Sequence, residues 1–167
     1  MRKLPCFITA VIVFILQASV LPFVFGGVTQ PNLIFVFVVL IALHSRPKTA
    51  IITALIGGFC QDVIIGNFFG IHMLPYLVIA FVCSSIGENI DRDQWFLTLL
   101  VVLVATEACL IISCMVLWLS GQYIRIFTYL LQYSIFMLIY HAILALPIDH
   151  IVWYLKNDDG YSFMSYR

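Results

Sequence analysis

Long apolar stretches alternate with short polar segments along the whole chain. A helix needs roughly 20 apolar residues to cross a hydrocarbon core of about 30 Å, and most of the stretches approach that length. The pattern predicts six transmembrane helices, at residues 4–25, 32–43, 49–65, 71–86, 96–119 and 126–146. Residues 148–155, which follow Pro147, are expected to lie at the membrane interface. The expected fold is an all-α membrane protein in which residues 1–167 form one compact bundle.

The second apolar segment is the shortest, and it either spans the membrane or re-enters on the same side. With six spans and a cytoplasmic N-terminus, seven of the eight Lys and Arg residues lie in the cytoplasm, and only Arg125 lies outside. A re-entrant segment would leave three of the eight inside. Because cytoplasmic loops are enriched in Lys and Arg, the sequence favours six spans with both termini in the cytoplasm.

The first apolar stretch follows a basic N-terminus, Met1-Arg2-Lys3, which is how both a secretory signal and a spanning helix begin. The stretch continues from Leu4 to Phe25. That is longer than the roughly 7–15 residues of a signal core. We therefore expect a first spanning helix.

Composition supports lipid as the solvent for most of the chain. Hydrophobic residues make up 63% and charged residues 10%, whereas a soluble domain carries roughly a quarter charged residues. The formal net charge is zero, which argues against a nucleic-acid binder with a clustered basic face. The five cysteines form no metal-ligand spacing and are expected to be buried apolar side chains. Since the familiar catalytic and nucleotide-binding motifs are also missing, we expect no enzyme, metal or cofactor.

Small residues mark faces where helices approach closely. They recur at about four-residue intervals on the third and fourth spans, which places them on one side of each helix. Such a face either packs within the bundle or receives a partner's transmembrane helix, and spacing alone does not separate the two. The candidate residues are Ala50, Ala54, Gly57 and Gly58 on the third span, and Ala80 and Ser84 on the fourth.

Glu107 is the charged residue that lies deepest in a predicted span. A carboxylate near the membrane centre costs about 2.5 kcal/mol or more, so it should face the bundle interior. Counting from the turn at Gly121 places His141 about one turn from its depth, and the hypothesis is a hydrogen bond from Glu107 to His141 or Tyr140. Its role is structural, or it contacts or gates a partner, or it relays protons. Gln132 and Tyr133 are further candidate partners.

Asp62 ends the third span, where a carboxylate is on the unfavourable side of the helix dipole and needs a partner. We expect it to order the turn from Gly66 to Gly70, with Asn67 and His72 nearby, or else to contact a periplasmic partner. At the start of the second span, Pro31 and Asn32 indicate a helix beginning, because proline is tolerated there.

Several of these segments resemble the MreD family of rod shape-determining membrane proteins. The resemblance covers residues 16 to about 86, and the family departs from this chain at Ala54-Leu55, where it often has Gly-Phe, and at Gln61. The matching segments are Leu16-Gln17-Ala18-Ser19-Val20-Leu21-Pro22, Gln30-Pro31-Asn32-Leu33, Ile41-Ala42-Leu43, and Gly58-x3-Asp62-x3-Gly66-x3-Gly70 with Met73-Leu74 after it. The motif positions expected to matter structurally are Pro31, Asn32, Gly58, Asp62, Gly66 and Gly70.

The resemblance implies a non-enzymatic scaffold in the bacterial inner membrane. Proteins of this family bind the single transmembrane helix of MreC. They act with the MreB cytoskeleton, a SEDS glycosyltransferase and a class B penicillin-binding protein to organise peptidoglycan synthesis and cell shape. The family bundle is thought to be similar to substrate-binding subunits of energy-coupling-factor transporters.

That similarity supplies the alternative function, a substrate-binding membrane subunit of a vitamin-type transporter. A third alternative is an intramembrane enzyme such as a protease or lipid transferase. The predicted outer loops are short and nearly uncharged, which favours the scaffold.

Overall fold

The computed structural model describes residues 3–26, 30–65, 70–87, 94–121 and 126–157. Within these ranges the regular secondary structure is helical, without strands. The prediction of an all-α membrane protein is confirmed: the described residues form six helices, three of which are long and apolar enough to span a membrane. Arg125, the cation predicted on the outer side, lies outside the described residues.

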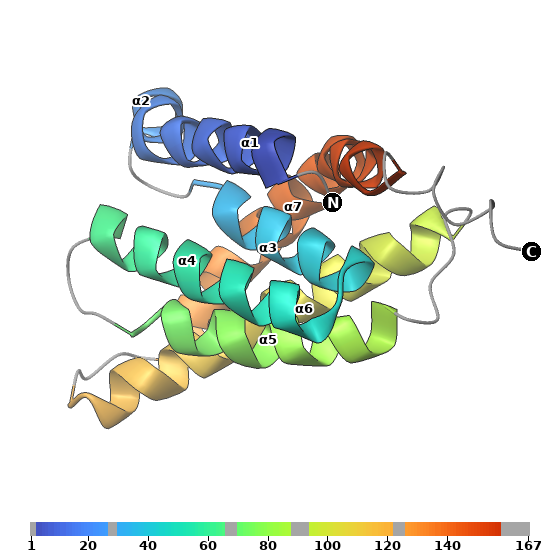
Figure 1. Cartoon of the computed structure of the whole chain (residues 1–167). Coiled ribbons are helices and arrows are strands. Elements are labelled where there is room, and N and C mark those ends of the chain that lie inside the picture. The colour runs from blue at the N-terminus through green and yellow to red at the C-terminus, as the bar shows by residue number, and fades with distance from the viewer. Residues whose placement is uncertain (1–2, 27–29, 66–69, 88–93, 122–125, 158–167) are drawn as a thin grey trace, which may run out of the picture.

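The described residues form six helical bodies, and Figure 1 shows how these are arranged. The first body is continuous, because residues Ile15, Val20 and Leu21 at the junctions between its three parts keep right-handed helical dihedral angles. A π-helical turn, η1, lies in its middle. The elements are α1 (Lys3–Ile15), η1 (Leu16–Val20), α2 (Leu21–Phe25), α3 (Leu33–His44), α4 (Pro47–Ile65), α5 (Met73–Gly87), α6 (Trp95–Leu119) and α7 (Ile126–Asn157).

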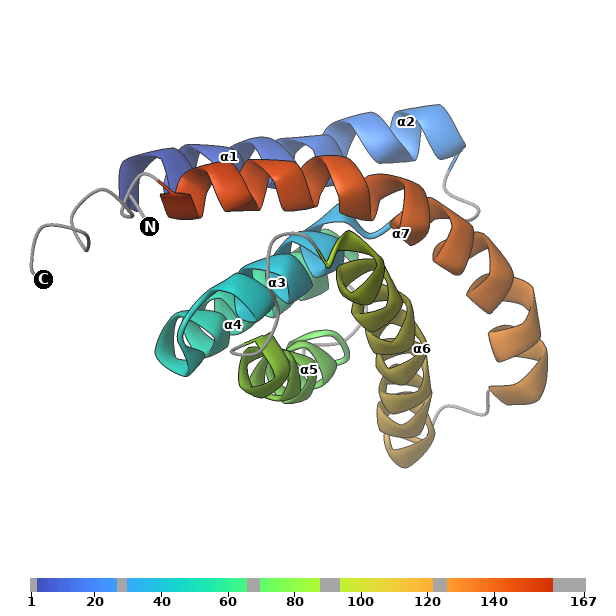
Figure 2. The same ribbon diagram turned by 90° about the vertical axis from the view of Figure 1, so that its right-hand side faces the viewer.

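Successive helices run in alternating directions, so the beginning of α1 and the end of α7 lie at the same end of the bundle (Figures 1 and 2). Among the described residues, three helical segments are long and apolar enough to cross a membrane: Leu4–Phe25, Trp95–Leu119 and Tyr133–Lys156. Helices α3 and α5 are apolar but shorter. The molecule therefore combines spanning helices with shorter ones held among them.

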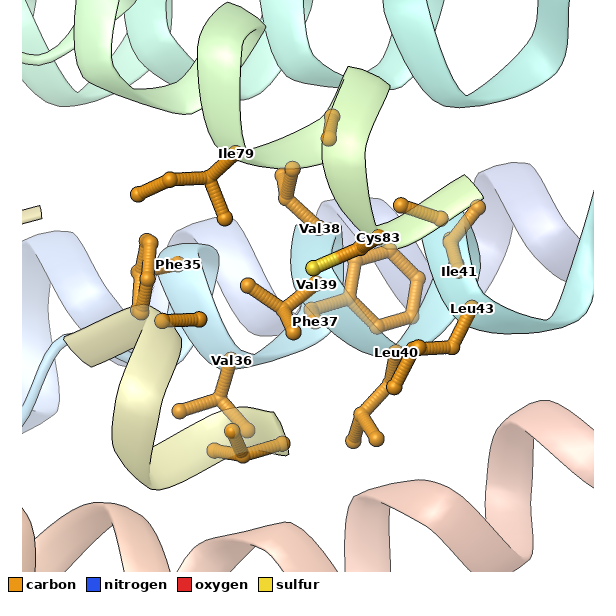
Figure 3. Close-up of a cluster of buried hydrophobic side chains, with 14 of the residues drawn as sticks. Phe35, Val36, Phe37, Val38, Val39, Leu40, Ile41, Leu43, Ile79 and Cys83 are labelled. Carbon is orange, nitrogen blue, oxygen red and sulfur yellow. The ribbon is translucent and has the colours of Figure 1, made fainter. Parts of the chain in front are cut away.

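Helix α3 is the centre of the bundle. All twelve of its residues are buried, and it contacts α1, η1, α4, α5, α6 and α7. Figure 3 shows its side chains pointing outward on every side, with Ile79 and Cys83 of α5 packed against them. Twelve residues of α-helix rise about 18 Å, less than the roughly 30 Å of a hydrocarbon core. An apolar helix this short is stable here because other helices surround it.

The last helix differs from its prediction. Helix α7 continues through Pro147 and ends at Asn157, instead of ending at residue 146. The reason is an apolar stripe formed by Ile148, Val152 and Leu155, which are buried. With four- and three-residue spacing they lie on one face of the helix, and α7 packs against α3. The segment expected at the membrane interface is therefore part of the bundle.

Candidate functional site

The beginning of α3 lies inside the bundle, where its first backbone N–H groups have no partners within the helix. Lipid offers no replacement for them, so the protein must supply acceptors. Asn32 is the N-cap residue, and its Oδ1 accepts a hydrogen bond from the Phe35 N–H at 3.0 Å. Gln17, from η1, accepts a hydrogen bond from the Leu33 N–H through Oε1 at 2.7 Å. Two side chains from different helical bodies therefore cap this helix.

Five buried residues surround this cap, and we call them the central polar cluster: Gln17, Asn32, Tyr76, Thr106 and His141. The Asn32 amide donates to the Tyr76 hydroxyl at 2.6 Å. The Asn32 backbone N–H donates to Nε2 of His141 at 3.1 Å. His141 Nδ1 lies 2.8 Å from the Thr106 hydroxyl. The cluster joins η1, α5, α6 and α7 to the start of α3.

The hydrogen bonds determine the protonation state of His141. Its Nε2 accepts from a backbone N–H, so that nitrogen carries no proton. The Thr106 hydroxyl donates to the carbonyl of Val102 at 2.8 Å, so Thr106 accepts the proton carried by His141 Nδ1. The ring is therefore a neutral imidazole with both nitrogens engaged. Such a histidine has no free lone pair for proton abstraction, and its two hydrogen bonds join α7 to the start of α3 and to α6.

Gln17 reaches the cap because of the π-helical turn. Residues Leu16–Val20 form this turn, and Gln17 is its fully buried residue. A π-helical turn carries one residue more than an α-helical turn, which rotates the side chains that follow. Gln17 Nε2 has no hydrogen-bond partner among the described residues, and nothing in the structure explains that. In the sequence, Gln17 belongs to a segment that resembles the MreD family, but no contact of its side chain was predicted.

Asp62 organises the junction between α4 and α5. It accepts hydrogen bonds from the backbone N–H of Gly70 at 2.7 Å and of His72 at 2.9 Å, and its Oδ1 lies 2.8 Å from His72 Nδ1. These donors precede Met73, the first residue of α5. The carboxylate therefore lies near the favourable, N-terminal end of α5. The predicted partners Gly70 and His72 are present, whereas Gly66 and Asn67 lie outside the described residues.

Two glycines of the family motif are explained by the same junction. A Cβ at Gly58 would lie 2.4 Å from the Cα of Met73, so only glycine allows the two backbones to approach. Gly70 has a φ of 103°, which other residues rarely adopt. The spacing of Gly58, Asp62 and Gly70 thus brings the end of α4 onto the start of α5.

A second polar contact joins α3 and α7 at the opposite end of α3. The ring Nε2 of His44 lies 2.7 Å from Oδ1 of Asp149, and both side chains are largely buried. The His44 ring lies 4.7 Å from the ring of Trp153, over which the Lys156 ammonium is placed at 4.6 Å. The sequence did not predict this contact, because the two residues are 105 positions apart in the chain.

The structure corrects the expected partner of Glu107. The Ser134 hydroxyl of α7 donates a hydrogen bond to Glu107, while His141 is bonded to Asn32 and Thr106. Tyr140 packs edge-on against Phe25. Counting residues estimated the depth, but it ignored rotation about the helix axis. Successive residues point about 100° apart, so Thr106 faces the interior and Glu107 lies at its edge, half-buried. The side chain of Gln132 lies outside the described residues.

The small residues singled out on two spans all lie inside the bundle. Gly57 faces α3, because a Cβ there would meet side chains of Val38 and Ile34. Gly87 of α5 also lies close to the Leu43 carbonyl. A Cβ at Gly87 would be 1.9 Å from that oxygen. The sequence did not predict the contact of Gly87, because this residue follows the apolar stretch 71–86 and was not considered as part of a packing face. The buried set is Ala50, Ala54, Gly57, Gly58, Ala80 and Ser84.

An apolar groove of about 290 Å³ opens between α5 and α6. Its α5 wall extends from Val78 to Ile86, and its α6 wall extends from Leu100 to Ile112. The floor includes the buried residues Cys83 and Ala105. The lining is almost entirely apolar, so the groove suits hydrocarbon or an apolar helix face, and not a polar small molecule.

Buried polar groups that tie helices together, and apolar surfaces that face outward, define an integral membrane protein. A sequence model of the rod shape-determining protein MreD matches residues 1–156. The chain therefore belongs to the MreD family, as its motifs indicated. No curated protein and no solved structure matches the chain. Membership makes it a membrane protein concerned with cell shape.

Proposed function

We propose that this chain is a non-enzymatic scaffold of the bacterial elongation complex, and that it binds an MreC-like single-span membrane protein. Through that partner it acts with MreB, a SEDS glycosyltransferase and a class B penicillin-binding protein to organise peptidoglycan synthesis. The observation that carries the proposal is the family match over residues 1–156. The chain lies in the bacterial inner membrane, with both termini in the cytoplasm.

The geometry supports a role in assembly more than one in chemistry. His141, at the centre of the polar cluster, is bonded through both ring nitrogens. Among the described residues, no group of three or more His, Cys, Asp or Glu could hold a metal ion. Helices in lipid associate through close packing and a few polar contacts, and the outward surfaces of α1, α5 and α6 offer large apolar side chains for such packing.

Copurification tests the proposal most directly. The full chain is expressed with a tagged MreC-like protein of the same organism and extracted in a mild detergent. A single-span protein of similar length that has no role in cell-wall synthesis serves as the control partner. The proposal expects recovery of the MreC-like protein well above the control. Equal recovery of both proteins with a folded bundle would contradict it.

A cellular experiment tests the role in shape. Depletion of this chain from a rod-shaped host should produce round cells, and re-expression of the full chain should restore rods. Normal rods after complete depletion would contradict the proposal.

A further inference from the structure

The exposed face of α6 carries a carboxylate near the middle of a predicted membrane span. Glu107 is the thirteenth of the 25 residues of α6, about 18 Å along the axis from either end. Val104 and Ile111, one turn before and one turn after it, are 61% and 46% exposed. Because residues three and four apart lie on the same side of a helix, Glu107 lies along this lipid-facing stripe.

The bundle does not enclose Glu107 as it encloses the central polar cluster. Its neighbour Thr106 is 2% exposed, whereas Glu107 is half-buried. The Ser134 hydroxyl donates one hydrogen bond, but a carboxylate offers about four acceptor sites. Ionisable groups inside membranes normally face a protein interior or a water-filled cavity. A half-exposed carboxylate at this depth therefore indicates a surface that another protein covers.

The same stripe borders the apolar groove between α5 and α6. Val104 and Ala108, which are three residues before and one residue after Glu107, both line the groove. The α6 wall extends from Leu100 to Ile112. Glu107 lies within that length beside Val104, but it does not line the groove, and its carboxylate contacts Ser134 of α7. An apolar channel with an acceptor beside it matches the face of a transmembrane helix that carries one polar donor.

We propose that the α5–α6 groove, with Glu107 at its edge, docks the transmembrane helix of a partner protein that presents a hydrogen-bond donor side chain at mid-membrane. The inference rests on the proposed function in taking the bundle as a receptor for a partner's helix. A lipid acyl chain would also fill the groove, but it has no donor for the carboxylate. Complementarity between donor and acceptor therefore selects a protein helix.

Photocrosslinking in cells tests the docking face. A photoreactive phenylalanine is placed at Val104, and a matched control carries it at Ile52 of α4, which is 57% exposed on another helix. The full chain is expressed with the tagged MreC-like protein, and adducts are identified by mass. An adduct with that protein from position 104, in clear excess over position 52, is the expected result. Adducts with phospholipid alone at position 104, or equal yields at both positions, would overturn the proposal.

Substitutions test the donor–acceptor contact. Polar contacts between membrane helices are modest, so Glu107→Leu should lower the crosslinked fraction about three- to tenfold. Glu107→Gln keeps an acceptor oxygen and should restore at least half of the yield, if the bundle elutes as wild type on size exclusion. An unchanged yield with Glu107→Leu would overturn the proposal.

The two proposals fail in different ways. If the MreC-like protein copurifies with wild type but crosslinks from position 52, the docking face is wrong and the scaffold role stands. If it does not copurify with wild type at all, the scaffold role fails and this inference fails with it.

Discussion

Thr106 and Glu107 are adjacent on α6, yet Thr106 is buried inside the bundle and Glu107 lies at its edge. Thr106 is buried, and its hydroxyl contacts His141 and the Val102 carbonyl. Glu107 points about 100° away, towards the edge of the membrane-facing stripe, where Ser134 donates to it. One group completes a network inside the chain. The other lies where a second protein can reach it.

The difference shows how the polar groups of a membrane protein divide between assembly and recognition. Lipid is as apolar as a leucine side chain, so burying apolar surface gives helices little reason to associate. Interior hydrogen bonds and close backbone contacts then determine which helices pack together. Glu107, at the edge, makes one hydrogen bond to α7, from Ser134, and a carboxylate has further acceptor sites that a partner can use.

The largest expected effect comes from the central polar cluster. Asn32→Leu removes the acceptor for the Phe35 N–H and the donor to the Tyr76 hydroxyl. Each buried group left without a partner costs about 1–3 kcal/mol, so we expect a loss of about 3 kcal/mol in the free energy of unfolding. Asn32→Ser retains a capping oxygen and should lose about half as much. Detergent-titration unfolding measures both variants, and wild-type stability for Asn32→Leu would contradict the importance of the cluster.

Close packing of α4 on α5 ranks second. Gly58→Ala places a methyl group 2.4 Å from the Met73 Cα, and overpacking of this kind costs about 1–3 kcal/mol. Gly57→Ala is the matched control, because its methyl group meets the Val38 side chain at 2.6 Å, and a side chain moves more easily than backbone. The midpoint of thermal aggregation in detergent should fall further for Gly58→Ala. The reverse order would show that the α4–α5 contact is not the tighter one.

The smallest effect isolates one hydrogen bond. Thr106→Val keeps the shape of the side chain but leaves the His141 Nδ1–H without its acceptor. We expect a loss of about 1 kcal/mol in unfolding free energy. Thr106→Ser restores the hydroxyl and should recover most of that loss. Equal stability of the valine and serine variants would mean that the bond contributes nothing.

The sequence predicted where the helices lie and which polar residues they carry. It did not predict how each helix is rotated about its own axis, and therefore which side chains meet. Apolar length and the distribution of Lys and Arg indicated six helices, and Pro31-Asn32 indicated where α3 begins. The family motif identified Gly58, Asp62 and Gly70. In the structure these three residues form the close junction between the end of α4 and the start of α5. These features depend on neighbouring residues or on a regular spacing, so they can be recognised in a single sequence.

Contacts between distant segments were harder to predict. Depth along a helix can be counted, but the direction of a side chain depends on how neighbouring helices cross, so Glu107 was paired with His141 instead of Ser134. The π-helical turn that directs Gln17 to the Leu33 N–H has no sequence signature. Pro147 indicated a helix end, yet packing of Val152 and its apolar neighbours against α3 keeps α7 helical beyond it.

The division between Thr106 and Glu107 is tested most directly by measuring unfolding stability and partner recovery on the same two variants. For Thr106→Val we expect lower stability, with unchanged recovery of the MreC-like protein per folded molecule. For Glu107→Leu we expect stability within about 0.5 kcal/mol of wild type and recovery reduced about three- to tenfold. If Glu107→Leu unfolds the bundle, or if Thr106→Val abolishes recovery from folded protein, the two faces of α6 do not have the separate roles assigned to them.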